Sequence, residues 1–473
     1  TLDAASVAHF LGDCPRLSSH GKTFEVSLAP LDYPDDRSLD KQVATALARV
    51  VRDGLDGDVL VFLPGVHEIR RAGQTLGALA KTHDLVVLPL HGTLSADAQD
   101  RALVRLPRRK VILATNVAET SVTIDGIVAV IDSGLARVPF HSPWTGLAEL
   151  RVAKISRASA TQRAGRAGRT APGRCLRLYT QHDHDMRPAY DRPEVVRLDL
   201  AETFLLLVAL GQDVAAFAWF EPPPVSALDA ARTLLERLGA LAGDGTLSMI
   251  GRRMVSFPVH PRLARVIVAG EELGVGVPSV QVAAVLSERD LRRGGRDART
   301  NGPSDVLDDW ENFLQVRQAR FAPHAADAAG IDLAAARAVD RAAAQLSRLC
   351  DRRAPVPPDV DTALQKALLT GFSDRVAKRR AAGSRELVLC HGGTVEQAPP
   401  SVVSEAALVI VVDVQARPGE KSLAQARKLS AIEPEWLLEL FPERLRDSSE
   451  LVWDTERERV EEAFVALDVL FDR

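Results

Sequence analysis

Two arginines and a glutamine stand out for their spacing in the segment QRAGRAGR, at residues 162–169. On a helix, Gln162, Arg166 and Arg169 would share one face, because they are spaced i, i+4 and i+7. Planar guanidinium groups bind phosphate oxygens and stabilise charge in phosphoryl transfer, and a glutamine can orient an attacking water. The two glycines between the arginines would let another surface approach. The segment therefore predicts a phosphate-handling surface, with a solvated basic helix as the alternative.

A second polar segment, TNVAETSVTIDG, follows an apolar run at residues 115–126. Its small hydroxyl and amide groups suit contacts with phosphates and sugars, which carry no sequence information. Asp125 could accept a hydrogen bond from a ribose hydroxyl or from an arginine. The alternative is an ordinary strand-to-helix loop with a Thr or Ser cap. Weaker turn signals follow other apolar runs, at Leu63–Gly65 and at His91-Gly92.

Five short apolar runs must position these segments, and they alternate with helical patterns (58–64, 84–90, 110–116, 126–134 and 174–180). Such alternation predicts an α/β fold with a parallel sheet covered on both faces. Because ligands of such sheets bind beyond the carboxyl ends of strands, we expect chemistry just after Leu63, Leu113 and Ile131. Turn residues flanked by β-prone residues also predict a hairpin over 137–155.

The chain has 473 residues, which is more than one compact core holds. After the α/β region, its predicted secondary structure changes from helix to strand. Helical patterns with a short turn at Gly243–Gly245 predict a winged-helix module over residues 183–264. Residues 265–370 are rich in Ala and Arg without strand signals, which predicts a helical bundle. Residues 371–445 return to β character and predict a small barrel.

Composition limits the classes of function. The net charge of −4 means that a nucleic-acid site must be a local basic lining on a mildly acidic body. Four scattered cysteines without a C-x-x-C pair suggest neither a zinc site nor a disulfide framework. We therefore expect no bound metal in this chain and a reducing, cytoplasmic location. No apolar run reaches about 18 residues, so we expect no membrane span.

Together and in this order, the motifs resemble the second RecA-like domain of superfamily 2 helicases of the DEAH/RHA group, where they match motifs IV, V and VI. Three further segments resemble the winged-helix signature of that group: LGAL, GRRM and PVHPRL (238–241, 251–254 and 258–263). Residues 371–414 are similar to its OB-fold, and residues 401–414 and 433–441 to its bacterial HrpB branch. The resemblance implies an ATP-dependent RNA helicase that moves 3′ to 5′, with ATP and Mg²⁺ as cofactors and RNA as partner.

The resemblance also implies roles for individual residues. Gln162 would position the hydrolytic water, while Arg166 and Arg169 would contact the nucleotide phosphates. Thr123 and Asp125 would face the ribose and the nucleotide cleft. Residues in the turns after three of the strands would touch the nucleic acid: Phe62, Pro64, Gly65, Gly92, Thr115 and Asn116. The hairpin at 137–155 would be the one that separates strands.

A phosphate loop of the form G-x-x-x-x-G-K-[ST], which an ATPase of this class needs, does not occur in the sequence. Gly21-Lys22-Thr23 comes near, but Arg16 stands where the first glycine is required. Asp-Glu-x-His, which would hold Mg²⁺, does not follow any strand. We therefore expect an upstream RecA-like domain as the partner that supplies both, and we expect the chain alone to be inactive.

The resemblance assigns the ends of the chain as well. Residues 1–30 would be the end of the first RecA-like domain with its linker, and residues 31–182 the second RecA-like domain. Residues 446–473 would begin a C-terminal extension of the HrpB type.

Two other interpretations stay open at this point. The chain could be a stand-alone nucleic-acid-binding or scaffold module that never hydrolyses ATP. The set of Gln162, Arg166 and Arg169 favours an enzyme instead, since a pure binding module has no evident need of it. The substrate could also be DNA, because backbone contacts do not distinguish DNA from RNA without contacts to the 2′-hydroxyl.

Overall fold

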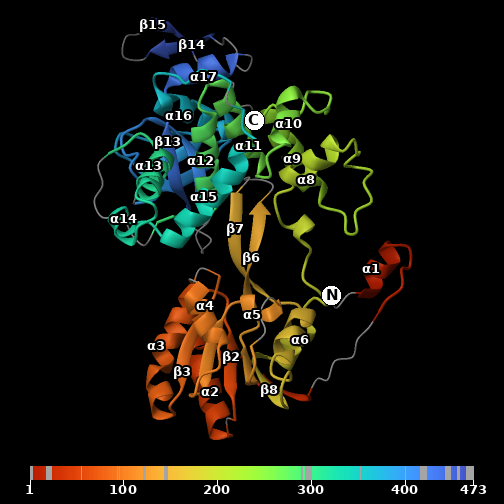
Figure 1. Cartoon of the computed structure of the whole chain (residues 1–473). Coiled ribbons are helices and arrows are strands. Elements are labelled where there is room, and N and C mark those ends of the chain that lie inside the picture. Colours follow the sequence, from red (N-terminus) through yellow and green to blue (C-terminus); the bar gives the residue numbers. More distant parts are fainter. Residues whose placement is uncertain are drawn as a thin grey trace. The chain divides into compact units, whose positions relative to one another are not determined.

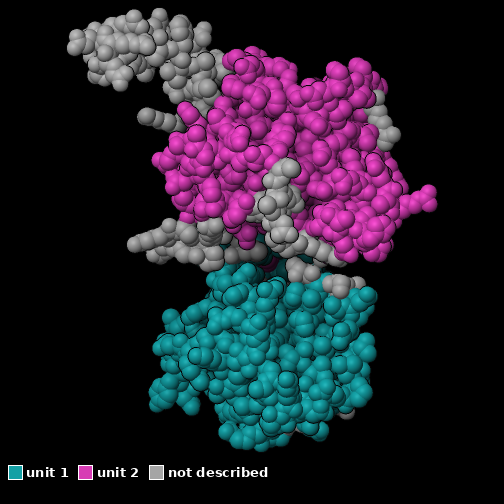
Figure 2. Space-filling view, turned by 90° about the vertical axis from the view of Figure 1, so that its left-hand side faces the viewer, with its two compact units in different colours: residues 1–140, 150–197 teal, residues 141–149, 198–473 magenta. Residues whose placement is uncertain are grey.

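The computed structural model describes residues 4–17, 24–54, 56–92, 94, 96–120, 124–142, 147–288, 291–292, 301–351, 353–399, 401–415, 423–442, 449–454 and 459–464. The chain divides into two compact units, coloured teal and magenta in Figure 2. The first unit comprises residues 1–140 and 150–197, and the second comprises residues 141–149 and 198–473.

The first unit is built on a six-stranded parallel sheet with the strand order β1-β8-β5-β2-β4-β3 (Figure 1). Its strands are β1 (Val26–Leu31), β2 (Asp58–Phe62), β3 (Val86–Leu90), β4 (Lys110–Ala114), β5 (Ile127–Asp132) and β8 (Gly173–Thr180). Five of the six coincide with the apolar runs, so the predicted parallel sheet is confirmed. β1 is an addition, and the expected boundary after residue 30 falls inside it.

Helices cover both faces of this sheet, because successive side chains along a buried strand point to opposite sides. Val59 and Val61 of β2 face a core shared with α2 and α3, while Leu60 and Phe62 face a core shared with α4, α5 and α6. The helices of this unit are α1 (Ala4–Phe10), α2 (Leu39–Arg52), α3 (Val66–Thr82), α4 (Ala96–Leu103), α5 (Val117–Thr120), α6 (Arg157–Gly165), α7 (Gln181–Asp185) and the 3₁₀ turn η1 (Glu194–Val196).

Each edge strand of the sheet contains a proline, Pro30 in β1 and Pro89 in β3. Proline has no N–H to donate, so it is tolerated where a strand has only one neighbour. The register of β1 against β8 shifts between Ala29 and Leu31, on either side of Pro30. This outer position also explains why β1 lacks the continuous burial of the central strands.

A two-stranded hairpin leaves the sheet after β5 and consists of β6 (Leu135–Ser142) and β7 (Leu147–Lys154). It confirms the hairpin predicted over 137–155, although the turn residues 143–146 lie outside the described residues. At its base, Ala136 packs with Ile155 and with Ala160 of α6. The hairpin is thereby anchored to the helix that carries the arginine segment.

The second unit joins helices to a closed five-stranded barrel, β10-β11-β13-β12-β9. Between α9 and α10, Leu241 and Leu247 form an antiparallel bridge, the small wing of a winged-helix domain. The winged-helix, helical-bundle and barrel parts of the predicted fold class are thus present. The helices are α8 (Ala201–Ala209), α9 (Val225–Arg237), α10 (Met249–Met254), α11 (Pro261–Glu272), α12 (Gly276–Ser287), α13 (Asp305–Gln318), α14 (Pro323–Ala328), α15 (Leu333–Ser347), α16 (Val360–Gly371), η2 (Ser373–Arg375) and α17 (Pro434–Leu440). The strands are β9 (Val376–Arg379), β10 (Glu386–Leu389), β11 (Thr394–Gln397), β12 (Leu408–Gln415), β13 (Ala424–Ala431), and a separate pair, β14 (Ser449–Asp454) with β15 (Arg459–Phe464).

Two close contacts join α11 to its neighbours, one to η2 and one to α12. The Arg262 guanidinium on α11 donates from both terminal nitrogens to the Asp374 carboxylate, with Nη2 at 2.6 Å from Oδ2. Burial by itself would raise the pKa of Asp374, but the charge and hydrogen bonds of Arg262 lower it below its usual range. Where α11 meets α12, a Cβ added to Gly270 would lie 2.5 Å from Ser279 Cβ.

Among the described residues, no helix is both long and apolar enough to span a bilayer.

Candidate functional site

The helix that carries the arginine segment, α6, begins at a well-defined cap and ends earlier than its sequence suggests. Ser156 Oγ accepts a hydrogen bond from the Ser159 N–H at 3.1 Å, which satisfies one of the free donors of the first turn. The α-helix ends at Gly165. Beyond it the backbone bonds become i→i−3, as the Arg166 N–H donates to the Arg163 carbonyl and the Gly168 N–H to the Gly165 carbonyl.

The expectation that three side chains share one helical face is therefore wrong for Arg169, which lies beyond the end of α6. Gln162 is half-buried on the helix, Arg166 is buried at its C-cap, and Arg169 is exposed. The two arginines are nevertheless neighbours. Burial first, and then the positive charge of Arg169, lower the pKa of Arg166 from its ordinary value.

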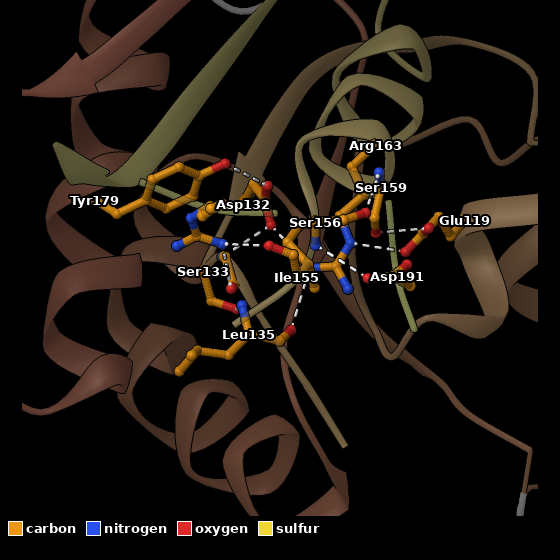
Figure 3. Close-up of polar contacts among 12 residues, drawn as sticks. Glu119, Asp132, Ser133, Leu135, Ile155, Ser156, Ser159, Arg163, Tyr179 and Asp191 are labelled. Carbon is orange, nitrogen blue, oxygen red and sulfur yellow. Dashed lines mark hydrogen bonds and ion pairs between the residues drawn. The ribbon is translucent and has the colours of Figure 1, made fainter. Parts of the chain in front are cut away.

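Arg163, which the sequence did not single out, lies at the centre of a buried polar network (Figure 3). Its Nε donates to Glu119 Oε2 at 3.0 Å, and its Nη1 donates to Asp132 Oδ1 at 2.9 Å. Its guanidinium also lies over the Phe62 ring, 4.7 Å from the ring centroid. Burial opposes the charged form, but the two carboxylates outweigh it and raise the pKa of Arg163.

Asp132 extends this network across the end of β5. It has no exposed surface, and it accepts hydrogen bonds from the Gly134 N–H at 2.9 Å and from the Tyr179 hydroxyl at 3.1 Å. Arg187 stacks on the Tyr179 ring at 3.9 Å and donates to the Gly134 carbonyl at 2.7 Å. The position expected to carry chemistry just after Ile131 thus holds α6 against the sheet instead.

Glu119 joins the second polar segment to the arginine segment. Its Oε1 accepts from the Ser159 hydroxyl at 2.6 Å, beside the bond from Arg163 (Figure 3). Its backbone carbonyl accepts a hydrogen bond from Arg166 Nη2. Sequence spacing along α6 offered one hint, since Ser159 and Arg163 are four residues apart and so share a face.

The turns expected to contact nucleic acid lie together at the carboxyl edge of the sheet. Ala114 of β4 is in register with both Phe62 of β2 and Leu90 of β3. The backbone continues this alignment, because the Thr115 N–H donates to the Leu90 carbonyl at 3.2 Å. Those turns contain Pro64, Gly65, Gly92, Thr115 and Asn116, of which Gly92 and Asn116 are exposed, Thr115 is half-buried and the first two are buried.

Phe62 is a correction to that set. Its side chain has no exposed surface and packs in the core beneath Arg163, so it supports the network and is not available to a nucleic acid. Asp125 is exposed, but it precedes Gly126, whose carbonyl accepts from the Asp58 N–H at the amino ends of β5 and β2. Asp125 therefore lies at the opposite edge from Asn116. Thr123 lies outside the described residues.

Comparisons with known proteins found helicases at the level of families, of relatives and of solved structures. The family described as "Helicase conserved C-terminal domain" matches residues 42–171, and "Helicase associated domain (HA2), winged-helix" matches residues 231–259. The chain is 32% identical over 465 residues to the pre-mRNA-splicing factor ATP-dependent RNA helicase prp22 of Schizosaccharomyces pombe, covering 93% of this chain and 40% of that protein. It is 39% identical over 291 residues to the ATP-dependent RNA helicase HrpB of Escherichia coli, covering 61% of this chain and 36% of that protein.

Two crystal structures of Escherichia coli HrpB align with 99% of this chain. One, titled a DExH-box NTPase, has a TM-score of 0.79 at 29% identity; the other, titled a DEAH/RHA helicase, has a TM-score of 0.77 at 30% identity. The chain belongs to the DEAH/RHA helicases. It spans about two fifths of the curated relatives (40% and 36%) and 54% and 55% of the two solved HrpB chains.

Membership of the DEAH/RHA helicases explains the layout of the first unit. The helicase match runs from α2 through the turn after α6, so it includes Gln162, Arg166, Arg169 and the buried network below them. The winged-helix match covers the second half of α9, the wing and α10. Among the described residues, no group of three or more His, Cys, Asp or Glu could hold a metal ion.

Proposed function

We propose that this chain is the arginine-bearing part of an ATP-dependent RNA helicase, completed by another RecA-like domain that supplies the phosphate loop. The two relatives named as ATP-dependent RNA helicases support this proposal, and the chain aligns with 40% and 36% of their lengths. The Mg²⁺ that neutralises phosphate charge would be held by the other domain. The observation that carries the proposal is the buried Arg163 network, which anchors α6, the helix that leads into Arg166 and Arg169.

Arg166 and Arg169 would contact the transferring phosphate in this scheme, and Gln162 would orient the attacking water. Arg166 Nη2 donates to the neutral backbone carbonyl of Glu119. A charged phosphate oxygen is a stronger acceptor than a neutral carbonyl, so this one hydrogen bond would strengthen if a phosphate oxygen replaced the carbonyl. Asp125, together with Thr123, would face the ribose from the amino edge of the sheet.

RNA would lie along the carboxyl edge of the sheet, over the turns that contain Gly65, Gly92, Thr115 and Asn116. Their backbone and small polar groups suit phosphate contacts, which position a strand without reading its sequence. The hairpin β6–β7 would separate strands, and translocation would run 3′ to 5′, as in the family that the motifs resemble. Alternate closing and opening of the two RecA-like domains would couple each hydrolysis to a step along RNA.

The test is RNA-stimulated ATP hydrolysis by the protein in which this chain is joined to its phosphate-loop domain. Arg166→Ala should lower kcat on the order of 10³–10⁵-fold, as for other arginine fingers. Arg157→Ala, at an exposed position of the same helix, is the matched control and should stay near wild type. Equal rates for Arg166→Ala and wild type would remove Arg166 from the mechanism.

The same assay separates the remaining alternatives. Stimulation by DNA oligonucleotides as strong as by RNA would favour a DNA substrate. Binding of RNA without any hydrolysis, in the presence of an intact phosphate loop, would favour a binding module.

A further inference from the structure

Glu119 occupies a position that no proposed role explains. It is neither at the nucleic-acid turns nor among the groups proposed to meet the nucleotide, yet three different side chains of α6 and its C-cap bind it: Ser159, Arg163 and Arg166. Its side chain is 13% exposed, and its main ionic partner, Arg163, is 1% exposed. A carboxylate held this tightly fixes the backbone that carries it.

The backbone next to Glu119 leads directly to the proposed RNA contacts. The Glu119 N–H donates to the Asn116 carbonyl at 2.9 Å, and the Ala118 N–H donates to the Thr115 carbonyl at 3.2 Å. α5 has only four residues, too few for its own hydrogen bonds to hold it in place. Its position therefore depends on contacts with the rest of the unit, which are the burial of Ala118 in the core and the hydrogen bonds of Glu119 with α6.

Glu119 also contacts Arg166, through its backbone carbonyl. Because the Glu119 carbonyl accepts from Arg166 Nη2, a shift of α5 changes the acceptor of the proposed arginine finger. Arg163 has two further acceptors besides Glu119, namely Asp132 and the Leu135 carbonyl at 3.2 Å. Glu119 thus connects the turn at the sheet edge, through α5, to an arginine at the proposed nucleotide surface.

We infer that Glu119 is a positioning residue that couples RNA binding at Thr115–Asn116 to the placement of Arg166. The inference rests on the proposed function and deepens it by naming the residue through which RNA influences the nucleotide site. Coupling of this kind is reciprocal: RNA must change the affinity for nucleotide by the same factor by which nucleotide changes the affinity for RNA.

The experiment measures this factor directly in the protein that contains both RecA-like domains. A fluorescein-labelled oligouridylate is titrated with and without a non-hydrolysable ATP analogue, and the analogue is titrated with and without RNA. Glu119→Ala should reduce the coupling factor by roughly 2- to 30-fold in both titrations, the range found for residues that carry coupling. Thr161→Ala, at an exposed position of α6, is the control and should retain the wild-type factor.

If Glu119 had a merely structural role, Glu119→Ala would weaken the affinities for RNA and for nucleotide but leave the coupling factor unchanged. This result would overturn the inference. Should Glu119→Ala not fold, Glu119→Gln serves instead. It keeps an acceptor for Arg163 but loses the charge, so a smaller reduction of the factor is expected and an unchanged factor refutes the inference. A wild-type protein that shows no RNA-stimulated hydrolysis would overturn the proposed function itself, which is a separate outcome.

Discussion

Replacing Arg163 by methionine tests whether the buried network holds the first unit together. Met fills a similar space without charge, so the variant leaves Asp132 and Glu119 without their shared cation. Asp132 has no exposed surface and, among the described residues, would retain the Gly134 N–H and the Tyr179 hydroxyl as its hydrogen-bond donors. Removing one member of a buried ion pair costs about 3–5 kcal/mol, a large share of the roughly 5–15 kcal/mol that stabilises a folded domain.

Hydrogen–deuterium exchange is the suitable assay, because a chain of two units need not unfold in one step. Amides of β5 and β8 should exchange on the order of 10²–10⁴-fold faster in Arg163→Met, since each 1.4 kcal/mol corresponds to about tenfold. Arg70→Met, at an exposed position of α3, is the matched control and should change stability by no more than about 0.5 kcal/mol.

A second substitution separates the loss of charge pairing from the loss of packing. Arg163→Met combined with Asp132→Asn should exchange more slowly than Arg163→Met alone, because the uncompensated carboxylate is gone. If Arg163→Met and Arg70→Met gave the same exchange rates, the network would not stabilise this unit and the reasoning would fail.

Other predictions concern both units. Asp374→Asn should destabilise the second unit by about 3–5 kcal/mol near neutral pH, because it removes the hydrogen-bonded counter-ion of the buried Arg262. Since folding lowers the pKa of Asp374, the wild-type contribution is complete above the unfolded pKa of about 3.9 and is lost as the pH falls below it. Urea unfolding of wild type and variant should therefore converge below about pH 4, and a constant difference would contradict the assignment. Gly270→Ala should cost about 1–3 kcal/mol by forcing α11 away from α12. Gly77→Ala should stabilise α3 by about 0.5–1 kcal/mol in thermal unfolding, because the new methyl group has no atom of the described residues within 4 Å apart from the backbone of its own helix and its chain neighbours.

The central strands of the sheet could be predicted from sequence because their environment leaves few alternatives. A strand buried on both faces must be apolar throughout, and β2 and β4 show this plainly. β1 escaped prediction because an edge strand is only half covered and because Pro30 argues against a strand. The hairpin could be predicted because its turn residues and the β-prone residues on either side are adjacent in the sequence.

The candidate site was predicted less completely, for two physical reasons. Gly165 and Gly168 are poor helix formers, so α6 ends where a regular 3.6-residue pattern would continue. The partners of Arg163 are distant in sequence, 44 residues away for Glu119 and 31 for Asp132, and no spacing rule connects them. Local patterns identified Arg166 and Arg169, but only the fold identifies Arg163, which anchors α6 to Glu119 and Asp132.

The prolines at the two edges of the sheet have a consequence for solubility. An open sheet can recruit a strand from another molecule wherever an outer strand offers a full row of N–H and C=O groups. Pro30 and Pro89 interrupt that row on both sides, so a second chain would find a gap at either end. A Pro89→Val variant should keep its fold and yet form aggregates at lower protein concentration, which light scattering would detect.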